Sequence, residues 1–150
     1  MRDASFVRPS LPEFLPPSVN RTVSILGATG SIGTQALELI AANPDRFTVG
    51  ALAAGNNWQL LAEQAVATQA PVIGLACSNH AELEERIAQL SKDRGIQYSP
   101  QIICGDDAAT QIASQGHCNV VLNGMTGSIG LLPTLAALAA GKLVALANKE

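Results

Sequence analysis

Three glycines, at positions 27, 30 and 33, lie between an apolar stretch at residues 22–26 and the start of a helical pattern. The first turn of a helix has backbone N–H groups without partners and the positive end of the helix dipole, so an anion binds there readily. Gly27 could take the tight turn that leaves the strand, Gly30 could let the backbone approach a phosphate, and Gly33 could let the helix pack closely. This arrangement predicts a site for the pyrophosphate of a dinucleotide. The alternative is a turn whose glycines serve close packing alone.

Small and polar residues also follow three other expected strands. Gly55-Asn56-Asn57 comes after residues 47–54, a glycine-rich turn at 124–130 comes after 119–123, and Asn148-Lys149-Glu150 comes after 143–147. In a parallel sheet with helical connections, these four loops meet at one edge, where ligands bind. The sequence therefore predicts a cofactor cleft there. A solvated strand end is the alternative interpretation of Lys149 and Glu150.

The order of the expected elements indicates the fold class. Apolar stretches typical of strands alternate with helical patterns through the whole of residues 21–150. This alternation predicts an α/β fold, a doubly wound parallel sheet of the Rossmann-like, NAD(P)-binding kind. Strands are expected at residues 22–26, 47–54, 71–76, 101–104, 119–123 and 143–147. Helices are expected between them, up to Asn43, and over 58–68, 81–93, 106–115 and from Pro133 to Gly141.

The end of the second strand bears on the choice of cofactor. No Asp or Glu occurs at residues 46–62, and an acid at this point usually binds the ribose 2′-hydroxyl of NAD(H). Its absence favours NADP(H), but no Lys or Arg occurs at residues 47–85 to pair with the 2′-phosphate. Asn56 and Asn57 would have to donate hydrogen bonds instead. The alternative for this pair is a helix N-cap with a left-handed turn.

Composition limits the class of partner. Hydrophobic residues make up 47% and charged residues 14%, which is typical of a folded domain. The net charge of −3 and the lack of a Lys/Arg cluster argue against nucleic acid or an anionic membrane and favour a small-molecule partner. No apolar stretch of about 18 residues free of helix breakers and charges is present, so a membrane span is not predicted. Cys77, Cys104 and Cys118 are expected to be buried thiols, His80 and His117 to be solvated, and no metal site is predicted.

Residues 1–20 contain four prolines without periodicity and lack the apolar core of a secretory signal. They are expected to form a flexible arm ahead of the domain at 21–150. A cytoplasmic protein is the simplest interpretation, and a plastid protein is the alternative if the arm belongs to a targeting segment.

Four blocks resemble the 1-deoxy-D-xylulose 5-phosphate reductoisomerase family in order and spacing. The resemblance covers about residues 21–150, and it implies the amino-terminal NADPH-binding domain of that oxidoreductase and isomerase of non-mevalonate isoprenoid synthesis. Such enzymes rearrange 1-deoxy-D-xylulose 5-phosphate, a phosphosugar, and reduce it to 2-C-methyl-D-erythritol 4-phosphate with NADPH and Mg²⁺ or Mn²⁺. The blocks are Gly27-Ala-Thr-Gly-Ser-Ile-Gly33, Ala53-Ala-Gly-Asn-Asn57, Gly127-Ser-Ile-Gly-Leu-Leu-Pro-Thr-Leu-Ala-Ala137 and Leu146-Ala-Asn-Lys-Glu150.

The resemblance also implies roles for individual residues. Lys149 would bind the substrate in the catalytic site. The residues implied to contact the cofactor pyrophosphate are Thr29, Gly30, Ser31 and Ile32. Those implied to meet the adenosine ribose and its phosphate are Gly55, Asn56 and Asn57, and Asn148 and Glu150 would also contact NADPH. Many family members carry Lys, Arg or Ser in place of Asn56, which leaves the strength of 2′-phosphate recognition open here.

The family's metal ligands, its lid and most of its phosphate contacts lie beyond the Asn-Lys-Glu block. This chain is therefore expected to be a fragment that binds NADPH at best weakly and turns over nothing, whereas the full-length enzyme is expected to be a homodimer. Two alternatives remain: another NADP-dependent reductase with a catalytic cysteine, and a non-catalytic nucleotide-sensing module.

Overall fold

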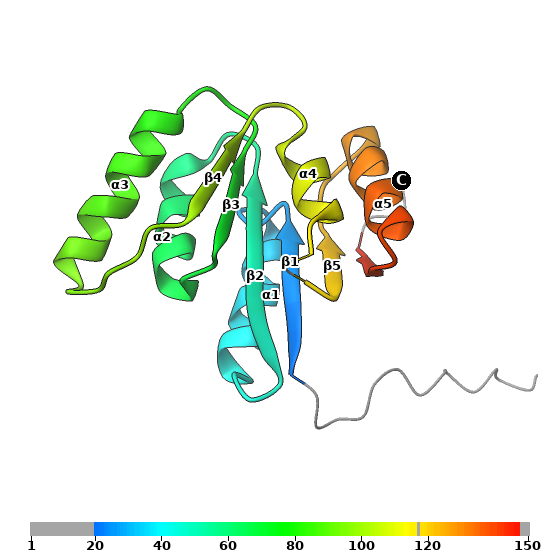
Figure 1. The fold of residues 1–150 in the computed structure, drawn as a ribbon, viewed down its shortest axis with the longest axis horizontal. Coiled ribbons are helices and arrows are strands. Elements are labelled where there is room, and N and C mark those ends of the chain that lie inside the picture. Colours follow the sequence, from blue (N-terminus) through cyan, green and yellow to red (C-terminus); the bar gives the residue numbers. More distant parts are fainter. Residues whose placement is uncertain (1–19, 117, 148–150) are drawn as a thin grey trace, which may run out of the picture.

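A single six-stranded parallel sheet forms the centre of the computed structural model, which describes residues 20–116 and 118–147 (Figure 1). Its strands are β1 (Arg21–Leu26), β2 (Phe47–Ala54), β3 (Val72–Leu75), β4 (Gln101–Cys104), β5 (Val120–Asn123) and β6 (Leu143–Leu146). The helices are α1 (Ser31–Ala42), α2 (Trp58–Thr68), α3 (His80–Asp93), α4 (Ala108–Ser114) and α5 (Leu131–Ala139), with a 3₁₀ turn η1 (Ser128–Gly130) before α5.

The strands are arranged in the order β4-β3-β2-β1-β5-β6, and each neighbouring pair is parallel. The chain builds outward from β1 to β4, then crosses back and builds outward from β5 to β6. The direction of winding therefore reverses between β1 and β5. This arrangement confirms the prediction of a doubly wound, Rossmann-like α/β fold.

Right-handed connections place the helices of the two halves on opposite faces of the sheet. The first three helices cover one face and the last two cover the other, where α4 and α5 lie side by side (Figure 1). The first core includes Ile25, Leu52, Ile73, Leu61 of α2 and Leu83 of α3. The second includes Leu26, Ala53, Val72, Ile112 of α4 and Ala137 of α5. Because both faces are covered, β2, β3 and β5 are apolar at almost every position, and β1 is apolar at three of its last four positions.

The observed bounds agree closely with the sequence prediction, and the differences have local causes. The expected helix at 106–115 is shorter, because Asp107 is the N-cap of α4 and Gln115 already has extended backbone. Asn79 is the N-cap residue of α3, and its side chain donates to the Glu82 carboxylate at 3.1 Å instead of bonding a backbone N–H of the helix. The short turn η1 had no counterpart in the prediction. Within the described part of the chain, no helix is long and apolar enough to cross a membrane.

In the turn between β1 and α1, backbone atoms pack directly against other backbone atoms. Gly27 has a left-handed backbone with φ of 76°, and its N–H and that of Ala28 both donate to the carbonyl of Ala53, at 3.0 and 2.9 Å. One turn later, a Cβ on Gly33 would lie 2.4 Å from the Gly27 carbonyl oxygen. The expected roles of Gly27 in the tight turn and of Gly33 in close packing are thus confirmed.

Replacing Gly33 by Ala should destabilise the fold, because the added methyl group meets backbone atoms that cannot rotate away. We expect Gly33→Ala to lower the free energy of unfolding, measured in urea, by about 1–3 kcal/mol. Gly55→Ala is the matched control, since its Cβ would meet no atom within 4 Å and its φ lies outside the left-handed region. A Gly33→Ala protein as stable as the Gly55→Ala protein would contradict this account.

Candidate functional site

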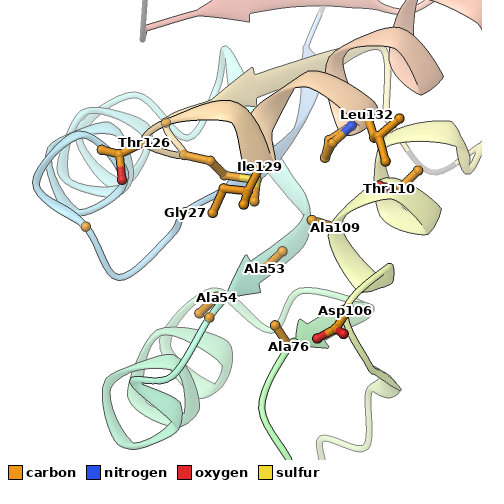
Figure 2. A pocket seen from close by; sticks show the side chains of 15 residues that line it. Gly27, Ala53, Ala54, Ala76, Asp106, Ala109, Thr110, Thr126, Ile129 and Leu132 are labelled. Atoms are coloured by element: carbon orange, nitrogen blue, oxygen red, sulfur yellow. The ribbon is translucent and has the colours of Figure 1, made fainter. Parts of the chain in front are cut away.

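A cavity of about 510 Å³ opens at the carboxyl edge of the sheet, which is within the range of small-molecule sites (Figure 2). Residues from five separate segments line it, and all of these segments follow or end a strand. They are Gly27, Gly30, Ala53, Ala54, Gly55, Ala76, Asp106, Ala109, Thr110, Gly124, Met125, Thr126, Ile129, Leu132 and Pro133. Three of the four loops that the sequence placed at this edge therefore meet there. The fourth, Asn148-Lys149-Glu150, lies outside the described residues.

Small side chains give the cavity its room. Alanines form much of the wall at the ends of β2 and β3 and at the start of α4 (Figure 2). Asp106 is the one charged side chain among the lining residues, and Figure 2 shows it near Ala76, at the β3 and β4 side. Sequence reasoning missed Asp106, although it follows the strand at 101–104 as the predicted site residues follow theirs.

The start of α1 is open to the cavity. Gly30 is the N-cap of α1, and no side chain among the described residues caps this end. The Gly30 carbonyl accepts the Thr34 N–H at 2.9 Å, and this is the first regular hydrogen bond of the helix. The N–H groups of the residues before Thr34 therefore have no carbonyl of the helix to bond. A Cβ on Gly30 would meet only the Gly27 carbonyl oxygen, at 3.4 Å. Gly30 is therefore not required by internal packing, and its bare face lines the cavity.

The other predicted residues of this turn lie around the cavity rather than in its wall. Thr29 is half-buried, Ser31 is exposed, and Ile32 retains 41% of its exposure. Ile32 packs toward the turn after β5, where a Cβ on Gly124 would lie 3.3 Å from it. That contact joins the two glycine-rich turns on either side of the point where the winding reverses.

A buried side-chain amide on α2 forms a hydrogen bond to the turn between β1 and α1. Gln64 is 9% exposed, and its Nε2 donates to the carbonyl of Ala28 at 2.8 Å. Its Oε1 is also buried and has no hydrogen-bond partner among the described residues. A polar side chain held in a core by one bond fixes the position of the group it bonds, because breaking that bond leaves both groups unsatisfied.

The Gly55-Asn56-Asn57 turn has a structural role as well as a place at the cavity. Asn57 is the N-cap of α2, and its Oδ1 accepts the Leu60 N–H at 3.2 Å. The capping alternative is thus confirmed, although the φ of −82° shows that the turn is not left-handed. The cap uses the carboxamide oxygen of Asn57, so the two N–H donors of its amide nitrogen remain available for other partners. Gly55 lines the cavity, and Asn56 is exposed beside it.

A buried asparagine holds the turn after β5. Asn123, only 1% exposed, donates through Nδ2 to the Gly130 carbonyl at 2.9 Å and to Thr134 Oγ1 at 2.8 Å. Its Oδ1 accepts the Met125 N–H at 3.1 Å. These bonds fix both ends of the segment that contributes Gly124 to Ile129 to the cavity. Sequence reasoning missed Asn123, whose signal was a polar residue at the end of an apolar strand.

The prediction of buried thiols is wrong for two of the three cysteines. Cys118 is buried, but Cys77 is only partly buried and Cys104 is exposed. The reason is topological, because β4 is an edge strand and Cys104 is its last residue. His80 is exposed as expected, whereas His117 lies outside the described residues. Among the residues that the structure describes, no group of three or more His, Cys, Asp or Glu could hold a metal ion.

Comparison with known proteins gives a consistent result. A family model described as 1-deoxy-D-xylulose 5-phosphate reductoisomerase matches residues 23–150. The enzyme of that name from Paenarthrobacter aurescens is 52% identical over 132 residues, and the one from Microcystis aeruginosa is 43% identical over 130 residues. The matches cover 87% of this chain but 33% and 32% of those relatives, so the chain spans about a third of their length.

Solved structures agree with the sequence relatives. The enzyme from Zymomonas mobilis in complex with NADPH has a TM-score of 0.76 and 40% identity, and it covers 87% of this chain. A DOX-P reductoisomerase in complex with NADPH, fosmidomycin and magnesium has a TM-score of 0.75 and 35% identity. This chain spans 32% and 30% of those two structures.

Truncating Gln64 should loosen the first glycine turn. We expect Gln64→Ala to lower the free energy of unfolding by about 2 kcal/mol, because the buried Ala28 carbonyl loses its partner. Gln59→Ala, an exposed glutamine on the same helix, should stay within about 0.5 kcal/mol of the parent chain. Urea denaturation measures both values. Equal stability of the two variants would show that the amide does not hold the turn.

Proposed function

The chain belongs to the 1-deoxy-D-xylulose 5-phosphate reductoisomerase family, and from this premise we propose that residues 21–150 are the NADPH-binding domain of such an enzyme. The observation that carries the proposal is the uncapped start of α1 at a cavity on the carboxyl edge of the sheet. We propose further that the whole enzyme isomerises and reduces 1-deoxy-D-xylulose 5-phosphate to 2-C-methyl-D-erythritol 4-phosphate. This chain spans about a third of the length of its relatives, so the reaction is proposed for the longer protein.

The residues present at the first turn fit a pyrophosphate. Backbone N–H groups of Ser31 and Ile32 lie at the positive end of α1, where they can donate to anionic oxygens. Gly30 has no Cβ where the ligand would approach, and the hydroxyls of Thr29 and Ser31 add donors in the same turn. Bound there, NADPH would supply the hydride for the reduction, and this turn would hold its phosphates.

The second turn fits the adenosine ribose and its 2′-phosphate. Asn57 keeps two N–H donors after capping α2, and the exposed Asn56 can add more. The Asp106 carboxylate would repel a phosphate, so we place the 2′-phosphate at the asparagines rather than at the β3 and β4 side. Neutral amides would recognise the phosphate less strongly than a cationic side chain does.

The remaining roles fall on residues outside the described part. We propose that Asn148 and Glu150, which follow β6 in the sequence, contact NADPH and that Lys149 binds the anionic phosphosugar substrate. The divalent metal is proposed to be held by residues beyond these 150, and the whole enzyme is proposed to be a homodimer. Two solved relatives support the cofactors, since one is a complex with magnesium and the other a complex with NADPH.

One alternative loses support from the position of the cysteines. A semialdehyde dehydrogenase type of reductase needs a nucleophilic thiol beside the cofactor. None of Cys77, Cys104 and Cys118 lines the cavity. The geometry therefore favours the reductoisomerase assignment over that class of reductase.

Gly30→Ala tests the cofactor site directly. The new Cβ would take up space where the pyrophosphate approaches, but it would meet only one protein atom within 4 Å. NADPH affinity should therefore fall at least about tenfold, a loss of about 1.4 kcal/mol of binding free energy. Unfolding in urea should change by less than about 0.5 kcal/mol. Fluorescence titration of NADPH measures the affinity, with Gln59→Ala as the control. Unchanged affinity in Gly30→Ala, or no binding by the parent chain, would refute the assignment.

Asn56→Arg tests recognition of the 2′-phosphate. A guanidinium can pair with the phosphate, so the ratio of NADPH to NADH affinity should rise about tenfold, and less so in high salt. Asn56→Gln, which adds length without charge, should leave the ratio near that of the parent chain. Parallel titrations with the two dinucleotides give the ratios. If Asn56→Arg tightened NADH and NADPH equally, the phosphate would have to bind elsewhere.

A further inference from the structure

Three side chains with reactive chemistry gather where β3 and β4 end, outside the cavity. Cys104 is the last residue of β4 and pairs in register with Leu75, the last residue of β3. Cys77 follows Leu75 by two residues, and His80 begins α3 directly afterwards. Neighbouring strand ends therefore bring Cys104 close to a thiol and an imidazole that are more than 20 residues away in the sequence.

The imidazole lies between a thiol and a carboxylate. His80 Nδ1 is 2.9 Å from Cys104 Sγ, and His80 Nε2 is 3.6 Å from Glu84 Oε2, one helical turn further along α3. The side chain of His80 is 48% exposed and that of Glu84 is 70% exposed, so solutes reach the group from solvent. A thiol that contacts a base, with the base oriented by a third group, is the arrangement of an activated nucleophile.

The second thiol lies close enough to affect the first. Desolvation by burial, followed by the charge of Cys77, raises the pKa of the Cys104 thiol. A thiol with a raised pKa is protonated at neutral pH, so the reactive thiolate forms only when a base removes the proton. His80 is the base within hydrogen-bond distance.

We propose that Cys104 is a peroxide-reactive thiol, that His80 is the base for it, and that Cys77 completes a reversible disulfide. In the first step, the imidazole takes the proton of Cys104, the sulfur attacks one oxygen of hydrogen peroxide, and the O–O bond breaks. Hydroxide leaves and gains a proton, which gives water and a sulfenic acid. In the second step, the Cys77 sulfur attacks the Cys104 sulfur, and the hydroxyl leaves as a second water. The two thiols lose two electrons, and the peroxide gains them.

Cys77 is connected to the cavity wall by a hydrogen bond, and Cys104 is connected to it through the chain. Cys77 donates its N–H to the Gly55 carbonyl at 3.1 Å, and its Sγ lies 4.0 Å from the Asn56 carbonyl oxygen. Asp106, two residues after Cys104, lines the cavity. A disulfide would pull on the second turn and on the segment that carries Asp106, so oxidation should weaken NADPH binding. This last step rests on the proposed function, whereas the thiol chemistry does not.

The test oxidises the 150-residue chain with limiting hydrogen peroxide and maps its peptides by mass spectrometry. We expect a Cys77–Cys104 disulfide, with the buried Cys118 left reduced. His80→Ala should slow the reaction at Cys104 about tenfold or more, since it removes the base. Cys77→Ser should stop at a sulfenic acid on Cys104, which dimedone traps. Cys118→Ser is the matched control and should react like the parent chain. Circular dichroism checks that each variant is folded.

Three results would overturn the thiol chemistry: oxidation of Cys118 as fast as of Cys104, an unchanged rate in folded His80→Ala, or no dimedone adduct on Cys104 in Cys77→Ser. Titration with NADPH before and after oxidation, and after reduction with dithiothreitol, tests the link to the cavity. A reversible loss of affinity of about threefold or more supports it, and a smaller change or none overturns it. If the reduced chain bound no NADPH, the proposed function would fail while the peptide map still decided the chemistry.

Discussion

The contact between the start of α1 and the turn before it is the constraint on which the rest of the site depends. Gly33 lies so close to the Gly27 carbonyl that no side chain fits between them. This approach brings the start of α1 to the edge of the sheet, where its N-cap residue Gly30 lines the cavity. The hydrogen bond from Gln64 to the Ala28 carbonyl then fixes the position of the turn relative to α2. Ile32 contacts the turn after β5. A wider turn would leave the positive end of the helix away from any ligand.

The reversal of winding between β1 and β5 makes room for a cavity beside that turn. The connections on either side of the reversal run to opposite faces of the sheet, while the turns after β1 and β5 stay in contact through Ile32 and Gly124. Alanines at the ends of β2 and β3 keep the space open, and Asn123 keeps the far wall in place with three hydrogen bonds. The same topology leaves β4 at an edge, which is why Cys104 is reached by solvent and by His80.

Most of the fold could be predicted because its signals are local. Apolar stretches bounded by glycine, proline and asparagine identified the strands, and their regular alternation with helices indicated the parallel sheet. The roles of Gly27 and Gly33 followed from their spacing in a strand-turn-helix context. What could not be predicted depended on neighbours distant in sequence. The pairing of β4 with β3 brings His80 to Cys104, and the burial of Asn123 and Gln64 depends on elements that pack around them. Asp106 had a local signal, its position just after a strand, but its place in the cavity wall depends on how β4 and α4 pack beside β3.

The carbonyl of Ala53 accepts two N–H groups at once, from Gly27 and Ala28. It therefore ties the turn after β1 to the end of β2, just before Gly55. The two turns that would hold the pyrophosphate and the adenosine ribose of the dinucleotide are parts of one body, so neither has to be ordered when the ligand arrives. Such pre-organisation removes a conformational entropy cost from binding. The shape of the site is set when the sheet folds, and recognition becomes a matter of displacing water from a surface already in place.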